Sequence, residues 1–247
     1  MRSRREIVTS AVIGAAVVIA NALPFSARAT VQKKPDGNAK PGGAERGAEE
    51  VSANEDLMRE HGVLRRALLV YALTSPRLRR GPESVPPGAI HRTAVLFRRF
   101  GEDYHERRLE EPLIFPAVKK QNPELARYVE ILLTQHQRGR EITDYIMSQT
   151  SGQKLATDAS ALSAALDSFV LMYQEHTARE DTIIFPAWHK LLSPHAYEEM
   201  GDKFEDIERQ QFGHDGFDDA VKQIGAIEAE LGLADLAQFT ASPPPKP

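Results

Sequence analysis

The chain has 247 residues, no cysteine, and 31 basic against 35 acidic residues, for a formal net charge of −4. Without cysteine it can form no disulfide, no thiolate metal site and no cysteine nucleophile, so His, Asp, Glu and Tyr are the ligand types that remain. The acidic balance and the absence of a basic stripe with interleaved aromatic residues argue against nucleic-acid binding.

Residues 1–29 have the features of an export signal. Arginines within residues 2–5 precede an apolar run over 7–20, too short to span a bilayer comfortably, and Ala27-Arg28-Ala29 has the small-x-small form of a cleavage site. Residues 3–8, SRREIV, resemble a twin-arginine signal, an address read by a receptor that implies export of an already folded protein. We therefore expect a periplasmic or otherwise exported protein that meets a membrane only if the signal stays uncleaved.

The composition changes twice after the signal. Residues 30–54 are largely Gly, Pro, Lys, Glu and Ala with almost nothing apolar to bury, so we expect a flexible linker. Residues 55–240 suffice for one folded domain. Residues 241–247 are rich in proline, which excludes a helix, and we expect a disordered tail.

Helix signals dominate the folded part and the alternation typical of strands is absent, so the sequence predicts an all-α fold. Helix starts are expected at Asn54, at Asn122-Pro123 and at Ser193-Pro194, because these residues suit the cap and first position of a helix. The breaks predict four long helices at roughly 55–79, 88–120, 123–149 and 158–190, and two shorter ones at 194–212 and 216–231.

Each long helix carries one histidine that its periodicity turns toward the interior. His61, His105, His136 and His176 each fall within an apolar stripe at spacings of three or four residues. Glu180 follows His176 by four residues and shares its helix face. A single inward histidine is usually an ordinary core residue, but four with inward acids are costly to bury unless they bind a metal. The ligand types suit iron, manganese or zinc.

An internal repeat identifies the matching acid on the second helix. Residues 110–117, EEPLIFPA, align with residues 180–187, EDTIIFPA, and this alignment makes Glu110 the counterpart of Glu180. The second acid of each copy is expected to be solvated or to contact a ligand: these acids are Glu111 and Asp181.

The spacing on the second helix is irregular. Glu110 follows His105 by five residues, and five residues of an ideal helix turn two side chains apart by ~140°. A one-residue bulge before Pro112, which lacks a backbone donor, would realign them. Glu106 or Glu111 is the alternative ligand on this helix.

The remaining histidines are expected to lie outside the site. His91 precedes His105 by fourteen residues, ~21 Å along a helix, so the two cannot share a metal. His189, His195 and His214 fall near helix ends or in loops and are expected at the surface.

Together these residues resemble the hemerythrin-like, or HHE cation-binding, domain family. The resemblance covers about 55–190 and rests on Glu60-His61-Gly62-x-Leu64, His105 with Glu110-Glu111 and Ile114-Phe115-Pro116, His136, and His176-x-x-x-Glu180 with Ile184-Phe185-Pro186. It implies an up-down-up-down four-helix bundle with a non-haem di-iron centre, oxo- or hydroxo-bridged. The implied metal ligands are His61, His105, Glu110, His136, His176 and Glu180.

One departure from the family bears on function. The third helix of true hemerythrins supplies two histidines a turn apart, whereas the residue four after His136 is Arg140, so one iron is expected to have fewer nitrogen ligands. This favours a di-iron enzyme acting on O2, peroxide or NO, with Tyr104 or Tyr173 nearby, over a reversible O2 or NO carrier or sensor. Whether the protein is an enzyme stays open, as does use of a metal other than iron; bulk metal storage is disfavoured.

The helical extension at 191–240 lies outside the resembling part. Its acids Glu205 and Glu208 could belong to a cap over one end of the bundle, either as a plain stabilising element or with an acid reaching toward the metals. Ile224, Ile227 and Leu231 recur at spacings of three and four, which predicts one short buried stripe on the final helix.

Overall fold

The computed structural model describes residues 51–121, 123–152, 155 and 158–245. The predicted export signal and nearly all of the predicted linker lie outside the described residues. Within the described part every regular element is a helix, which confirms the all-α prediction. No helix there is both long enough and apolar enough to cross a membrane.

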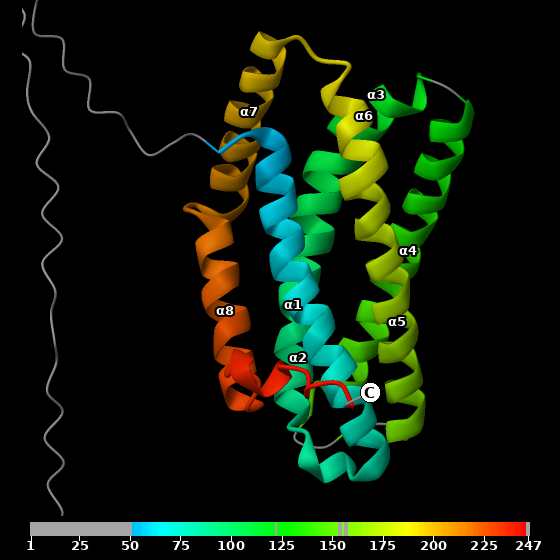
Figure 1. Ribbon diagram of the computed structural model, residues 1–247, viewed down its shortest axis with the longest axis vertical. Helices are drawn as coiled ribbons and strands as arrows, with labels where there is room; N and C mark the ends of the chain where they lie inside the picture. The colour runs from blue at the N-terminus through cyan, green and yellow to red at the C-terminus, as the bar shows by residue number, and fades with distance from the viewer. Residues whose placement is uncertain (1–50, 122, 153–154, 156–157, 246–247) are drawn as a thin grey trace, which may run out of the picture. The chain divides into compact units, whose positions relative to one another are not determined.

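The four predicted long helices are present (Figure 1). Two of them change from α-helix to π-helix and back along their length. The first is α1 (Ala53–Arg80) and the third is α4 (Pro123–Thr150). The second runs through α2 (Pro87–Leu96), the π-helical η2 (Phe97–Ile114) and α3 (Phe115–Lys119). The fourth runs through α5 (Ala159–Arg179), the π-helical η3 (Glu180–Ile184) and α6 (Phe185–His189). The extension comprises α7 (Pro194–Phe212) and α8 (Gly216–Glu230), and two short 3-10 turns are η1 (Pro82–Ser84) and η4 (Leu236–Phe239).

Side-chain caps decide where the helices begin. α1 begins after Ser52, whose hydroxyl accepts a hydrogen bond from the first turn at 3.4 Å. The start predicted at Asn54 is therefore wrong by two residues, because the serine provides an equally good cap further upstream. Ser193 caps α7 as predicted. Asn122 lies outside the described residues, and Pro123 opens α4.

In both copies of the repeat the π-helix returns to α-helix at the Phe-Pro, at Phe115 and at Phe185. Hydrogen bonds in a π-helix join residues five apart, so the five-residue spacing brings Glu110 to the side of η2 that carries His105. The irregularity predicted before Pro112 is present, as part of a much longer π-helical segment. η3 was not predicted, because a regular helix already placed His176 and Glu180 on one face.

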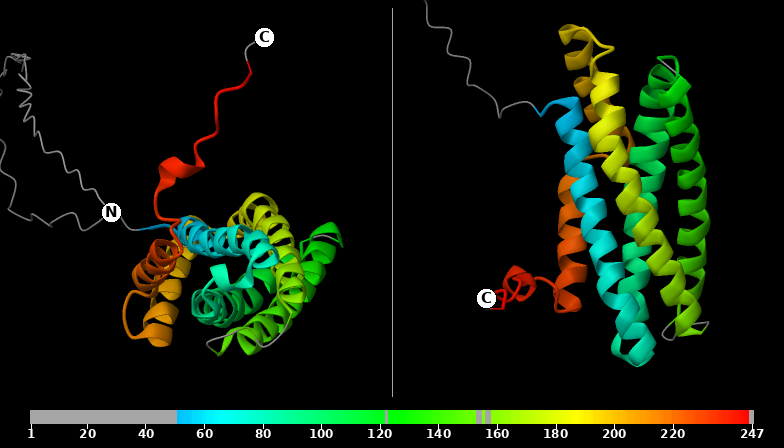
Figure 2. Two further views of the ribbon diagram at one scale, coloured as in Figure 1. Left: turned by 90° about the horizontal axis from the view of Figure 1, so that it is seen from below. Right: turned by 45° about the vertical axis from the view of Figure 1, so that its right-hand side comes forward.

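The helices pack side by side (Figures 1 and 2). α1 lies along α5, and α4 lies against α5, α2 and η2. α7 packs against α1 and η2, and α8 packs against α1 and α2, so the extension flanks the bundle instead of capping one end. The stripe predicted on α8 explains this position, because Ile224 and Ile227 are buried there, and Arg66 of α1 donates to Glu228 at 2.9 Å.

Aromatic side chains fill the bundle beside the histidines. The rings of Phe97 and Phe169 meet edge-on with centroids 4.8 Å apart, and Tyr173 packs against both. Tyr173 also lies so close to Gly139 of α4 that a Cβ at this position would overlap its ring and hydroxyl. The hydroxyl donates to Glu106 at 2.8 Å. The glycine is therefore required by the close approach of a side chain that reaches a buried acid.

We expect Gly139→Ala to destabilise the fold by about 1–3 kcal/mol, since an added methyl must displace Tyr173 from a filled core. Gly62→Ala is the matched control, because a Cβ there would meet no atom within 4 Å beyond its chain neighbours and the nearby backbone of α1. The control should instead stabilise α1 by about 0.5–1 kcal/mol. Denaturant unfolding measures both changes, and equal effects of the two substitutions would contradict the packing argument.

Candidate metal centre

Six of the residues singled out from the sequence meet inside the bundle. They come from α1, η2, α4, α5 and η3, and each side chain is at most 3% exposed: His61, His105, Glu110, His136, His176 and Glu180. The four imidazoles form two pairs. Pair A is His61 and His105, whose Nε2 atoms lie 3.0 Å apart, and pair B is His136 and His176, whose Nε2 atoms lie 3.1 Å apart.

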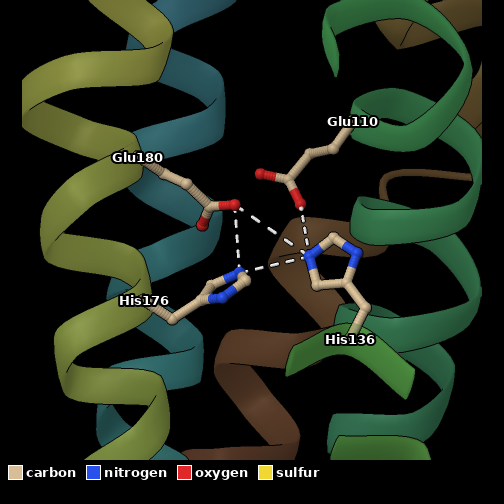
Figure 3. A group of neighbouring side chains, drawn as sticks. All are labelled: Glu110, His136, His176 and Glu180. Carbon is tan, nitrogen blue, oxygen red and sulfur yellow. Dashed lines mark hydrogen bonds and ion pairs between the residues drawn. The ribbon is translucent and has the colours of Figure 1, made fainter. Parts of the chain in front are cut away.

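Glu110 and Glu180 lie between the two pairs. In Glu110, Oε1 is 3.2 Å from Nε2 of His105, and Oε2 is 3.3 Å from Nε2 of His136. In Glu180, Oε2 is 3.5 Å from Nε2 of His61, and Oε1 is 3.0 Å from Nε2 of His176. Figure 3 shows the two carboxylates pointing toward one another across pair B. Each carboxylate therefore directs one oxygen to each pair.

The arrangement fits two cations. None of the four carboxylate oxygens of Glu110 and Glu180 has a hydrogen-bond partner among the described residues. A buried carboxylate loses several kcal/mol of hydration, which must be compensated. Two nitrogens that bind one ion at about 2.1 Å and about 90° apart lie about 3.0 Å from each other, and this matches the spacing of the Nε2 atoms within each pair.

The outward nitrogen of each imidazole is held by a polar side chain. His61 Nδ1 lies 2.7 Å from Asp181, and His136 Nδ1 lies 3.0 Å from Glu111. His105 Nδ1 contacts Glu60, and His176 Nδ1 lies 2.9 Å from the side-chain oxygen of Gln135. Each of these oxygens can accept a hydrogen bond from Nδ1–H, which leaves Nε2 as the inward nitrogen that a metal would bind.

The pKa values of the two central carboxyl groups are shifted in opposite directions. Burial raises the pKa of Glu180 well above its ordinary value, and the nearby Glu110 adds to the effect. Burial alone would also raise the pKa of Glu110, but the neighbouring His105 and His136 hold it well below its usual range. A cation bound between the two acids would remove their mutual repulsion.

The alternative ligands on the second helix lie on the outer side of pair B. Glu106 accepts hydrogen bonds from the Tyr173 hydroxyl at 2.8 Å and from Arg140 at 2.9 Å. It approaches only Nδ1 of His136, at 3.8 Å, and Glu111 also faces Nδ1. Arg140 contacts Glu111 as well and so offsets part of the negative charge of this outer group. Of the three acids, Glu110 is the one whose oxygens face the inward nitrogens.

Sequence reasoning missed Gln135, Arg65 and the outer role of Glu60. A pattern shared by two histidines could have indicated these residues. His61 and His136 each follow a Glu or Gln directly and precede an arginine by four residues. Arg65 contacts Asp181 just as Arg140 contacts Glu111. Comparing the flanks of the two histidines, as was done for the Phe-Pro repeat, would have found them.

The other histidines lie outside the site. His189, His195 and His214 are exposed, and His189 stacks on the ring of Tyr197 with centroids 4.0 Å apart. His91 is half-buried and its Nδ1 lies 3.3 Å from the Thr150 hydroxyl.

Comparison with known proteins supports the same conclusion. Residues 52–188 match the model of the hemerythrin HHE cation binding domain. The chain is 41% identical over 194 residues to the uncharacterized protein Mb2018 of Mycobacterium bovis and to the uncharacterized proteins MT2051 and Rv1995 of two Mycobacterium tuberculosis strains, covering 78% of this chain and 75% of each relative. No solved structure matches the chain significantly. The chain belongs to the hemerythrin HHE cation-binding domain family.

Proposed function

We propose that this chain is a non-haem di-iron protein that acts on O2, peroxide or NO in the periplasm or another exported location. The observation that carries the proposal is the position of Glu110 and Glu180, each with one oxygen toward pair A and the other toward pair B. Two ions bridged by two carboxylates need this arrangement, and facing helices of a bundle are where such sites are built. The proposed ligands are the two pairs and these two acids.

Iron is the proposed metal. Membership of a cation-binding family supports a metal site, and imidazole with carboxylate suits iron, manganese or zinc. Iron is favoured over the others by the resemblance of the motifs to hemerythrin-like domains. An iron pair, oxo- or hydroxo-bridged, would supply a change of redox state and open coordination positions for a small molecule.

The surrounding residues would keep the site dry and its imidazoles fixed. Phe115 lies against His136 and Phe185 against His61, each with ring centroids 5.4 Å apart. The two phenylalanines occupy equivalent places in the repeat.

We also propose that the four long helices alternate in direction, since short connections favour antiparallel neighbours.

We propose turnover in preference to reversible carriage. Pair B with one oxygen from each acid offers two nitrogens and two oxygens, and pair A with Glu110 offers two nitrogens and one oxygen, with a Glu180 oxygen 3.5 Å from His61. Both sets leave positions open on an octahedral ion. Arg140 stands where true hemerythrins have a further histidine, and it contacts Glu106 and Glu111 without adding a ligand. Open positions favour the approach of substrate or water.

The metal content of variants tests the ligand assignment. We expect about two iron atoms per chain in the wild-type protein, and a large loss of iron in both Glu110→Ala and Glu180→Ala, because either change removes a ligand from both ions. Glu106→Ala is the control and should retain the metal, since its oxygens are held by Tyr173 and Arg140. Elemental analysis of folded, unchelated protein gives the readout. Loss of iron in the Glu106 variant alone would show that the ligand on the second helix was misassigned.

Aeration of the reduced iron protein distinguishes turnover from carriage. We expect reductant to be consumed in proportion to O2 or peroxide, with no stable coloured adduct, because open positions admit further reaction. A carrier would instead develop a visible absorption band that disappears on degassing and returns over many cycles. Repeated oxygenation without consumption of reductant would make this a binding protein.

A further inference from the structure

The two histidine pairs are surrounded in nearly the same way. The acid after each bridging glutamate holds one imidazole of the opposite helix: Asp181 holds His61, and Glu111 holds His136. The residue before each of these histidines holds the other imidazole of the same pair. This second partner is Glu60 in pair A and Gln135 in pair B.

The charge of this second partner differs between the pairs. Both imidazoles of pair A rest against carboxylates, whereas His176 of pair B rests against the neutral amide of Gln135 at 2.9 Å. A carboxylate on Nδ1 makes an imidazole a stronger metal ligand than an amide does, and partners of this kind change metal affinity by about 10–100-fold. His176 of pair B is therefore the weakest of the four nitrogen ligands.

A surface pocket lies beside pair B. A pocket of about 130 Å³ between α4 and α5 is lined by Gln135 and His176 together with Tyr128, Ile131 and Arg179. His176 is 3% exposed, whereas His61 and His105 are 1% exposed and His136 is fully buried, so His176 is the imidazole nearest to the surface. Small solutes in this pocket would contact a candidate ligand and the amide that holds it.

We infer that the two metal positions are unequal: the ion at pair B is the exchangeable one, reached through the pocket between α4 and α5, and the ion at pair A is held more tightly. The inference rests on the proposed di-iron function and adds the position at which ions and small molecules enter. Gln135 and Glu60 act through the imidazoles that they contact, as positioning residues.

The rate of iron release to a chelator tests this inference. Protein loaded anaerobically with Fe²⁺ is mixed with a ferrous chelator, and the coloured complex is followed over time. We expect two phases, with one ion per chain released at least about tenfold faster than the other. Gln135→Glu should slow the fast phase by about tenfold and leave the slow phase unchanged, and Glu60→Gln should speed the slow phase.

Two further variants separate these effects from general changes in charge or fold. Gln223→Glu makes the same charge change at an exposed position on α8 and should alter neither phase. Ile131→Trp, at a pocket residue that is 56% exposed, should slow only the fast phase by narrowing the entrance. It keeps the inference testable even if a change at Gln135 prevents folding.

The outcomes distinguish the inference from the proposed function. Release of both ions in a single phase, or equal effects of Gln135→Glu and Gln223→Glu, would overturn the inequality of the two positions and leave the di-iron proposal standing. Wild-type protein that binds no iron, or only one ion, would overturn the di-iron proposal itself.

Discussion

The contact between two buried carboxylates and four imidazoles is the interaction on which the rest of the structure depends. Glu110 and Glu180 are fully buried, their oxygens accept no hydrogen bond from the described residues, and their nearest polar neighbours are the Nε2 atoms of pairs A and B. Such a group is unfavourable unless positive charge compensates it. The outer polar residues make sense in this light, because each of them fixes the outward nitrogen of one imidazole and leaves the inward nitrogen free for a metal.

The helices are irregular where this contact demands it. η2 is π-helical through most of the second helix, and η3 is π-helical from Glu180, the second bridging acid, to Ile184. π-helical segments are less stable than α-helix and are frequent at functional sites. Here η2 brings Glu110 to the side of its helix that carries His105, and in both repeats the phenylalanine five residues after the acid packs against an imidazole. Gly139 lies within α4 although glycine is a poor helix former, because its lack of a side chain makes room for Tyr173 to reach Glu106.

Much of the fold and of the inner site could be predicted from the sequence, because both depend on periodic patterns. The spacing of apolar residues placed four long helices and turned His61, His105, His136 and His176 inward, and the structure brings these side chains together. The features that were missed depend on tertiary contacts. The flanking position of α7 and α8 and the pairing of Gln135 with His176 each require knowledge of which helices are neighbours. The start of α1 is a local exception, because Ser52 and Asn54 are equally good caps. The extent of η2 could not be inferred from Pro112 alone, since one missing donor predicts only a local bulge.

Locating the metal ions themselves tests the two-metal centre most directly. Anomalous diffraction at the iron edge, from crystals of the iron-loaded protein, reports the number and position of the ions without reference to activity. We predict two peaks of similar height, one at pair A and one at pair B, each within bonding distance of both Glu110 and Glu180. A single peak, or a peak at the outer group of Glu106, Glu111 and His136, whose ligand atoms also lie within 4.8 Å of one another, would contradict it.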